Sequence, residues 1–361
     1  MKKPFVVSLL FFVAAAVFAQ SENADRSLSP YFLVTSKSGG QVEAMPLRST
    51  AATVNIAGII ADVRVSQTYV NAGKLPIEAV YVFPGSTRAA AGIFQAGKVP
   101  YVVAYAIHPD ITRTGNYVFR VSAMGEVQGR GGAKLVSSLG KKKVTIITVK
   151  NDFGQALAAG FKEAAPKFGL QITGEYEYGM ADRQFGAVVS KVKADEPEVI
   201  YASGYFFNAG PLVSQLRAAG ITAPIIGQEG YDSDKFIEIA GAASEGTLVT
   251  TSLDRDSDVP ATKAFLADYR KANNAGADMV AAASFTATSV LIEGLKRSGG
   301  KGGDALRAAM AGGTYVTPIG KLTFNSLNEV AKDIQVQVVK DKAFRRHSVI
   351  SDAALLAPPT K

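Results

Sequence analysis

The stretch Lys143-Val-Thr-Ile-Ile-Thr-Val149 opens the part of the chain that decides the fold. It is a short β-branched run, which is typical of a strand buried on both faces of a sheet. As far as Thr250, such runs alternate with segments that have helical spacing. We expect strands at 143–149, 170–176, 199–203, 224–227 and 246–250, separated by helices at 154–168, 184–193, 211–219 and 232–240. This alternation predicts an α/β fold with a parallel sheet, right-handed crossovers and helices on both faces.

Polar and aromatic residues follow three of these strands, at the end of the sheet where ligands bind in open α/β folds. They are Asn151-Asp-Phe153, Gly204-Tyr-Phe206 and Gln228-Glu229. An acid in the position of Glu229 can pair with an ammonium group, or it can be a first-turn acid of the next helix. The rings of Phe153 and Tyr205 can line a pocket, and both can equally be core aromatics.

Several short motifs follow one another in a characteristic order between residues 86 and 342. They are Val99-Pro100-Tyr101, Pro109-Asp-Ile-Thr112, Tyr117-Val-Phe-Arg120, Gln128-Gly129, Asp152-Phe-Gly154, Gly204-Tyr205, Glu229-Gly230, Ala240-Gly241 and Glu245-Gly246. Together they resemble the type I periplasmic solute-binding proteins of the leucine/isoleucine/valine-binding group. The resemblance implies two α/β lobes that close on a small ligand by a hinge motion. It also implies membrane permease subunits of an ABC transporter as partners, and no chemical reaction.

The resemblance further implies which residues contact the ligand in the second lobe. Glu229 corresponds to the residue that recognises an ammonium group. Tyr205 and Phe153 correspond to pocket walls, and Phe153 stands where the family has a tyrosine.

In the first lobe, the implied contacts fall on Gly85 and Ser86 and on the loop Tyr105-Ala106-Ile107. Pro84 occupies the position of a family serine, although Ser86 and Thr87 are adjacent. Ile107 stands where the family has a threonine, so a hydroxyl donor is lost. Backbone N–H groups of the loop can still hold a carboxylate. The ligand therefore stays open between a branched-chain amino acid, another small amino acid, an amide and an organic acid.

The first residues have the features of a secretory signal peptide. Lys2 and Lys3 precede an apolar run from Phe5 to Phe18, and we expect cleavage before Gln20. The run is too short for a transmembrane anchor. The chain contains no cysteine, so a lipid anchor cannot form on one. We expect a periplasmic protein without a lipid anchor.

Residues 30–85 carry a different, β-rich pattern after a polar segment at 20–29 that we expect to be disordered. The motifs Met45-Pro-Leu-Arg-Ser-Thr50, Gln67-Thr-Tyr69 and Ala79-Val-Tyr-Val-Phe-Pro84 resemble the first half of a VIT domain (vault protein/inter-α-trypsin inhibitor). This segment stands where the binding-protein family has its first strand–helix units, so the first lobe should be incomplete. An alternative is therefore a surface interaction protein that uses the VIT-like segment, or a remnant that binds no ligand.

The resemblance divides the rest of the chain into two lobes. We expect lobe 1 at 86–122 and 255–325, and lobe 2 at 123–254 and 326–345. The chain should cross between them at 122–125 and again at 251–255. Residues 346–361 are expected to form a loose tail.

The composition of the 361 residues favours binding over catalysis. The net charge is +8, but lysines and arginines are scattered and no nucleic-acid-binding motif is present. His108 and His347 are far apart, and neither a Gly-x-Ser-x-Gly nucleophile motif nor a phosphate-binding loop occurs. We therefore expect no catalytic residue, no metal site, no cofactor and no nucleic-acid partner, and a monomer.

Overall fold

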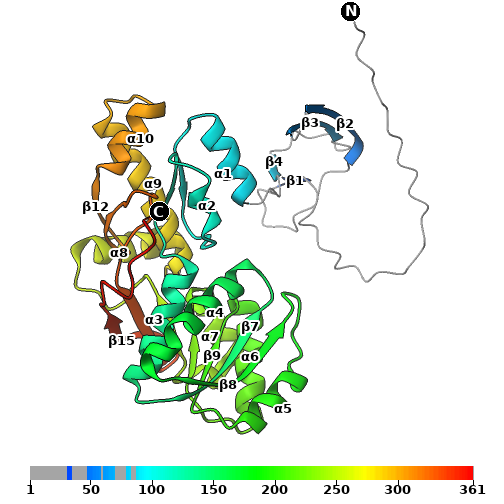
Figure 1. Ribbon diagram of the computed structural model, residues 1–361, viewed down its shortest axis with the longest axis vertical. Coiled ribbons are helices and arrows are strands. Elements are labelled where there is room, and N and C mark those ends of the chain that lie inside the picture. The colour runs from blue at the N-terminus through cyan, green and yellow to red at the C-terminus, as the bar shows by residue number, and fades with distance from the viewer. Residues whose placement is uncertain (1–30, 35–46, 58–59, 70–78, 83–86, 361) are drawn as a thin grey trace, which may run out of the picture. The chain divides into compact units, whose positions relative to one another are not determined.

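The computed structural model describes residues 31–34, 47–57, 60–69, 79–82 and 87–360. The chain divides into two compact units, Met1–Ser86 and Thr87–Lys361 (Figure 1). In the first unit, β1 (Tyr31–Val34) pairs antiparallel with β4 (Ala79–Val82), and β2 (Leu47–Ala57) pairs antiparallel with β3 (Ile60–Tyr69). The predicted signal peptide and the segment 20–29 lie outside the described residues.

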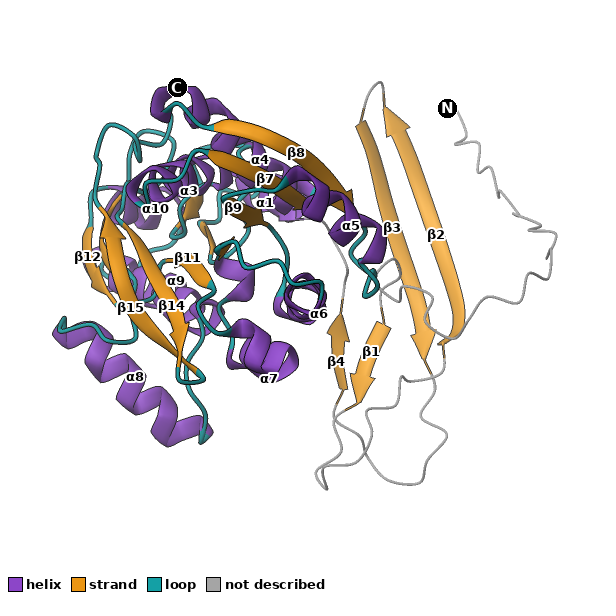
Figure 2. Ribbon diagram, turned by 90° about the horizontal axis from the view of Figure 1, so that it is seen from below, coloured by secondary structure: helices purple, strands orange, loops and turns teal. Residues whose placement is uncertain are grey.

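A seven-stranded mixed sheet forms the centre of the second unit. Its order is β8-β7-β9-β10-β11-β14-β15. The strands are β7 (Lys143–Val149), β8 (Gln171–Tyr178), β9 (Val199–Ala202), β10 (Ile225–Gly227), β11 (Leu248–Thr251), β14 (Ile334–Lys340) and β15 (Ala343–Ile350). The strands from β8 to β11 are parallel, as predicted, whereas β14 and β15 are antiparallel additions at one edge (Figure 2).

Helices pack against both faces of this sheet. They are α3 (Gly125–Ser138), α4 (Asp152–Ala164), α5 (Gly186–Asp195), α6 (Phe206–Ala218) and α7 (Asp234–Ala240). One apolar cluster combines α3 with the sheet, the other combines α5, α6 and α7 with it, and α4 contributes to both. We call the sheet and these helices lobe 2.

Local chemistry explains where two of these helices begin. The Asn151 side chain accepts a hydrogen bond from the Gly154 N–H at 2.9 Å and caps α4. The start predicted for α6 at Pro211 is wrong, because Pro211 lies inside a helix that begins at Phe206. The Asn208 side chain accepts from the Tyr205 N–H at 2.8 Å, which organises the earlier start.

The remaining elements of this unit form lobe 1. They are α1 (Thr87–Ala96), β5 (Tyr101–Val103), α2 (Asp110–Arg113), β6 (Val118–Arg120), α8 (Pro260–Asn273), α9 (Met279–Arg297), α10 (Gly303–Ala311), β12 (Thr314–Thr317) and β13 (Gly320–Thr323). Strands β5 and β6 are parallel, and β12 and β13 form an antiparallel pair. Helix α9 is long and apolar enough to cross a membrane. Its buried residues, however, belong to the core of lobe 1.

The C-terminal residues do not form a loose tail, so that expectation is wrong. Residues 343–350 form β15, which follows a tight turn at Asp341 and Lys342, both with positive φ. Leu355 and Leu356 are buried in the core of lobe 2. Arg130 donates hydrogen bonds to the carbonyl oxygens of Leu355 and Ala357. The segment is ordered because these contacts satisfy its backbone and bury its leucines.

Candidate functional site

The predicted site residues of lobe 2 all follow strands of the sheet. Phe153 lies in the first turn of α4 after β7, Tyr205 precedes α6 after β9, and Glu229 follows β10. The loop Tyr105-Ala106-Ile107 follows β5 in lobe 1. Gly85 and Ser86 lie outside the described residues.

The structure brings this loop next to the lobe 2 residues. Burial raises the pKa of the Tyr105 hydroxyl, and the charges of Glu229 and Tyr205 raise that pKa further, so the three side chains are near one another. The Ile107 side chain is buried in the same apolar cluster as Phe153. The Ile107 carbonyl accepts a hydrogen bond from the Gly125 N–H, at the start of α3, at 3.1 Å. The loop of lobe 1 therefore contacts lobe 2 directly.

A row of aromatic rings lies on the lobe 2 side. Phe153 stacks on Tyr205 with ring centroids 5.0 Å apart, and Tyr205 stacks on Phe207 at 5.6 Å. Asn151 donates to the Tyr205 hydroxyl oxygen at 3.3 Å, and burial raises the pKa of that hydroxyl. Tyr205 is therefore held in a fixed orientation by stacking and by one hydrogen bond.

Glu229 is 2% exposed and lies where the lobes meet. Its two oxygens accept from the Ser252 hydroxyl at 2.8 Å and from the Gln128 side-chain amide at 3.1 Å. Burial raises the pKa of Glu229 to about 7, against the hydrogen bond from Ser252 and the positive charge of Lys332, which both lower it. With this pKa, the carboxyl group changes between its neutral and ionised forms near neutral pH.

Lys332 supplies the opposite charge. Its ammonium nitrogen is buried and has no hydrogen-bond partner among the described residues. Burial lowers the pKa of Lys332 to about 8, while the charge of Glu229 raises it. Glu229 and Lys332 do not form a contact ion pair, so their charges attract each other across a longer distance.

Sequence reasoning missed three residues around Glu229, because each comes from a different part of the chain. Gln128 lies in α3, just after the chain enters lobe 2; Ser252 lies where it leaves, after β11; and Lys332 lies where it returns, before β14. Gln128 belongs to the motif Gln128-Gly129, which was a usable signal. Nothing in the sequence around Ser252 or Lys332 points to this site.

The arrangement can bind a small polar molecule. A buried carboxylate with two hydrogen bonds retains acceptor capacity for an ammonium group. The rings of Phe153, Tyr205 and Tyr105 offer apolar surface beside it. Within the described residues, no cluster of three histidine, aspartate or glutamate side chains could hold a metal ion.

The family comparison agrees with this architecture. A family model described as periplasmic binding protein matches residues 70–343. The chain therefore belongs to this family and has its two-lobed fold. A model for the vault protein inter-alpha-trypsin domain matches residues 32–107, a partial match that overlaps the first.

Curated relatives include two amino-acid-binding proteins. The leucine-, isoleucine-, valine-, threonine- and alanine-binding protein of Pseudomonas aeruginosa is 26% identical over 252 residues, which cover 69% of this chain and 67% of that protein. Leu/Ile/Val-binding protein homolog 3 of Brucella melitensis is 30% identical over 243 residues, 66% of each chain. Across such relatives, the chain spans from about half to about two thirds of their length.

Solved structures show the same fold. A leucine-binding protein from Thermotoga maritima has a TM-score of 0.69 at 25% identity, covering 73% of this chain and 76% of that one. The isoleucine complex of a branched-chain amino acid transporter substrate-binding protein from Streptococcus pneumoniae has a TM-score of 0.67 at 23% identity, covering 73% and 75%.

Proposed function

We propose that the chain is the solute-binding component of an ABC-type uptake system and holds a small amino acid between its two lobes. The observation that carries the proposal is the contact of the loop Tyr105-Ala106-Ile107 of lobe 1 with lobe 2, where Ile107 packs in the same cluster as Phe153 and its carbonyl accepts from the Gly125 N–H at 3.1 Å. A ligand that contacts both lobes stabilises the closed arrangement, because only that arrangement makes both sets of contacts. The leucine-binding relatives support an amino acid as the ligand.

Each part of an amino acid has a candidate partner. The ammonium group pairs with the Glu229 carboxylate, and an apolar side chain lies against Phe153 and Tyr205. The carboxylate binds the loop Tyr105-Ala106-Ile107, whose N–H groups have no hydrogen-bond partner among the described residues. The contribution of Gly85 and Ser86 stays a prediction of the family resemblance, since both lie outside the described residues.

The cellular setting follows from the same proposal. Residues 1–19 direct export, the protein acts in the periplasm as a monomer, and permease subunits recognise the closed lobes. The proposal keeps the expected division into two lobes, with lobe 2 extended through β15 to the buried C-terminal leucines, and assigns no catalytic step. The amino-acid-binding relatives favour this function over an interaction role for the VIT-like segment, whose family match is partial.

Calorimetry and thermal unfolding of the mature chain test the proposal. Leucine, valine and threonine are compared with 4-methylpentanoate, which is leucine without its amino group. A ligand at 100 times its Kd should stabilise the protein by about 2.7 kcal/mol. Glu229→Gln should weaken leucine binding by about 1.5–3 kcal/mol, roughly 10- to 150-fold, because a charged hydrogen bond is lost. The affinity for 4-methylpentanoate should stay nearly unchanged.

Glu238→Gln is the matched control, since Glu238 is an exposed acid on α7 paired with Lys235. It should leave both affinities unchanged. The proposal is wrong if no amino acid stabilises the wild-type chain, or if Glu229→Gln binds leucine as tightly as wild type does.

A further inference from the structure

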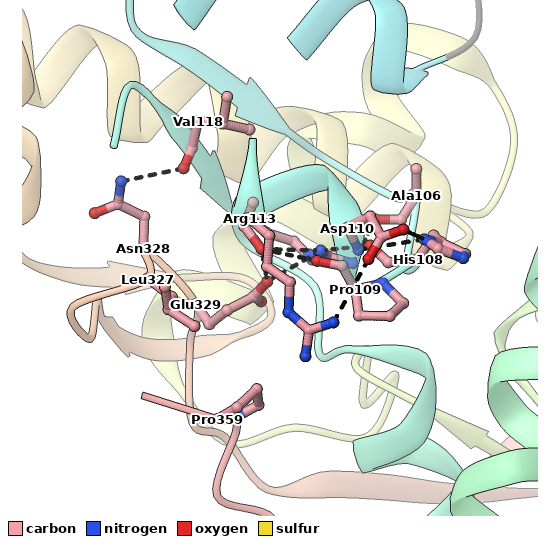
Figure 3. A network of polar contacts seen from close by, with 12 residues as sticks. Ala106, His108, Pro109, Asp110, Arg113, Val118, Leu327, Asn328, Glu329 and Pro359 are labelled. Atoms are coloured by element: carbon pink, nitrogen blue, oxygen red, sulfur yellow. Dashed lines mark hydrogen bonds and ion pairs between the residues drawn. The ribbon is translucent and has the colours of Figure 1, made fainter. Parts of the chain in front are cut away.

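Arg120 donates hydrogen bonds to the backbone of the lobe 1 loop that follows β5. Its side chain is 0% exposed at the end of β6. One terminal nitrogen, Nη1, donates to the Ala106 carbonyl at 3.1 Å, and Nη2 donates to the His108 carbonyl at 2.8 Å. Figure 3 shows Ala106 and His108 gathered at this network. One guanidinium group therefore fixes two peptide groups of the loop.

The direction of these peptide groups matters for ligand binding. In a trans peptide, the carbonyl of one residue and the N–H of the next point in opposite directions. The Ala106 carbonyl points to Arg120, so the Ile107 N–H points away from it. The Ala104 carbonyl accepts from the Ser122 hydroxyl at 2.5 Å, so the Tyr105 N–H points away from Ser122. Neither N–H has a partner among the described residues, which leaves both available to an anionic group.

Arg120 also attaches the loop to the segment that returns to lobe 2. Glu329, which Figure 3 labels, lies in this segment. Its Oε1 is 3.0 Å from Nη2 of Arg120. The Thr112 hydroxyl donates to the same carboxylate. The neighbouring Asn328 carbonyl accepts from the Arg120 N–H at 3.0 Å. The loop and the crossing segment therefore share one polar network.

The ion pair in this network adds little to the free energy of unfolding, although both of its charges are buried. Taking two charges out of water costs much of what their attraction returns, so a buried ion pair is weak evidence of stabilisation. Here Nε of Arg120 and Oε2 of Glu329 are buried without a hydrogen-bond partner among the described residues, so the pair is incompletely satisfied. The geometry that the pair imposes on the loop is its more specific effect.

We propose that Arg120 and Glu329 are positioning residues that aim the N–H groups of Tyr105 and Ile107 at the carboxylate of the ligand. The ion pair also connects the conformation of this loop to the segment around Glu329, through which the chain returns to lobe 2. The inference rests on the proposed function, because it concerns how the carboxylate site proposed there is held in place.

The test replaces both charges together, in the variant Arg120→Met with Glu329→Leu. Because both charges of the ion pair are removed together, the variant should still melt cooperatively, at a temperature below that of wild type because the Ala106 and His108 carbonyls lose their donor. Leucine should bind at least about tenfold more weakly. Its affinity for 4-methylpentanoate should fall by the same factor, since the weakened contact is with the carboxylate. This pattern differs from Glu229→Gln, which weakens leucine alone.

Two further variants make the outcome decisive. Arg113→Met is the matched control, because Arg113 is exposed and pairs with Asp110 within α2, and it should bind leucine like wild type. Arg120→Lys keeps the charge but lacks the planar fork that reaches two carbonyls, so it should lose part of the affinity. If the double variant does not melt cooperatively, Arg120→Lys alone decides the outcome.

The inference is overturned if the double variant, or Arg120→Lys in its place, folds and binds leucine with wild-type affinity. It is also overturned if the amide NMR signals of Tyr105 and Ile107 do not shift when leucine binds to the wild-type protein. A wild-type chain that binds none of the amino acids refutes the proposed function instead, before any variant is made.

Discussion

Replacing Lys332 by methionine should change the pH at which the protein binds its ligand. The positive charge of Lys332 lowers the pKa of Glu229, whereas burial raises that pKa to about 7. Without Lys332 the pKa of Glu229 rises above 7, and a protonated carboxyl group cannot pair with an ammonium group. Binding of leucine should therefore require a higher pH in Lys332→Met than in wild type.

The size of the change follows from the separation of the two groups. Unit charges 4 Å apart interact by about 4 kcal/mol near a protein surface, and the pair lies farther apart than a contact ion pair. We therefore expect the pKa of Glu229 to rise by about 1 to 2 pH units. At pH 7 the ionised fraction falls from about half to between roughly one tenth and one hundredth, so leucine should bind about 5- to 50-fold more weakly.

The pH dependence of stability has a definite sign for each group. The pKa of Glu229 is raised from 4.5 to about 7, so folding stability is lost as the pH rises through this range. The pKa of Lys332 is lowered from 10.5 to about 8, so stability returns as the pH rises from about 8 to 10.5. In Lys332→Met, the folding stability lost through ionisation of Glu229 should be lost over a range that extends to higher pH. The gain in stability between about pH 8 and 10.5 should disappear, because it comes from Lys332.

Calorimetric titration with leucine from pH 5.5 to 9.5 measures the effect. The variant should bind more weakly than wild type at pH 7 and approach it near the alkaline end. Lys321→Met, which replaces an exposed lysine of β13, is the control and should follow the wild-type curve. An unchanged or lower midpoint in Lys332→Met would show that Lys332 is not the counter-charge of Glu229.

Two further predictions concern packing and the C-terminal segment. Gly129→Ala should destabilise lobe 2 by about 1–3 kcal/mol, because a Cβ there would lie 2.2 Å from the Leu157 carbonyl oxygen of α4. Gly186→Ala, with no atom within 4 Å of the added Cβ, should instead stabilise by about 0.4–1 kcal/mol, and urea unfolding that ranks the two the other way round would contradict the packing argument. Arg130→Ala removes hydrogen bonds of 2.7 and 2.8 Å to the C-terminal segment and should lower the free energy of unfolding by about 1–3 kcal/mol in the same assay. An unchanged urea midpoint would mean that this segment does not stabilise the folded unit.

The strands and helices of lobe 2 were readable from the sequence because their signals are local. The β-branched run at Lys143–Val149 marks a doubly buried strand, and Asn151 caps the helix that follows it through its own side chain. Where a local signal was ambiguous, the prediction failed: a proline is common in a first helical turn, yet Pro211 lies inside α6. The C-terminal strand was missed because pairing with β14, rather than its own pattern, orders it.

The sequence by itself determined the fold class, the family resemblance and the position of Glu229 after a buried strand. The tertiary structure alone decided what surrounds that carboxyl group and the lobe 1 loop. Gln128, Ser252 and Lys332 meet at Glu229, and Arg120 reaches Ala106 and Glu329, because the chain passes repeatedly between the lobes. Such contacts join residues far apart in the chain, and a buried charge takes its pKa from all its neighbours in space, which no local pattern of residues records.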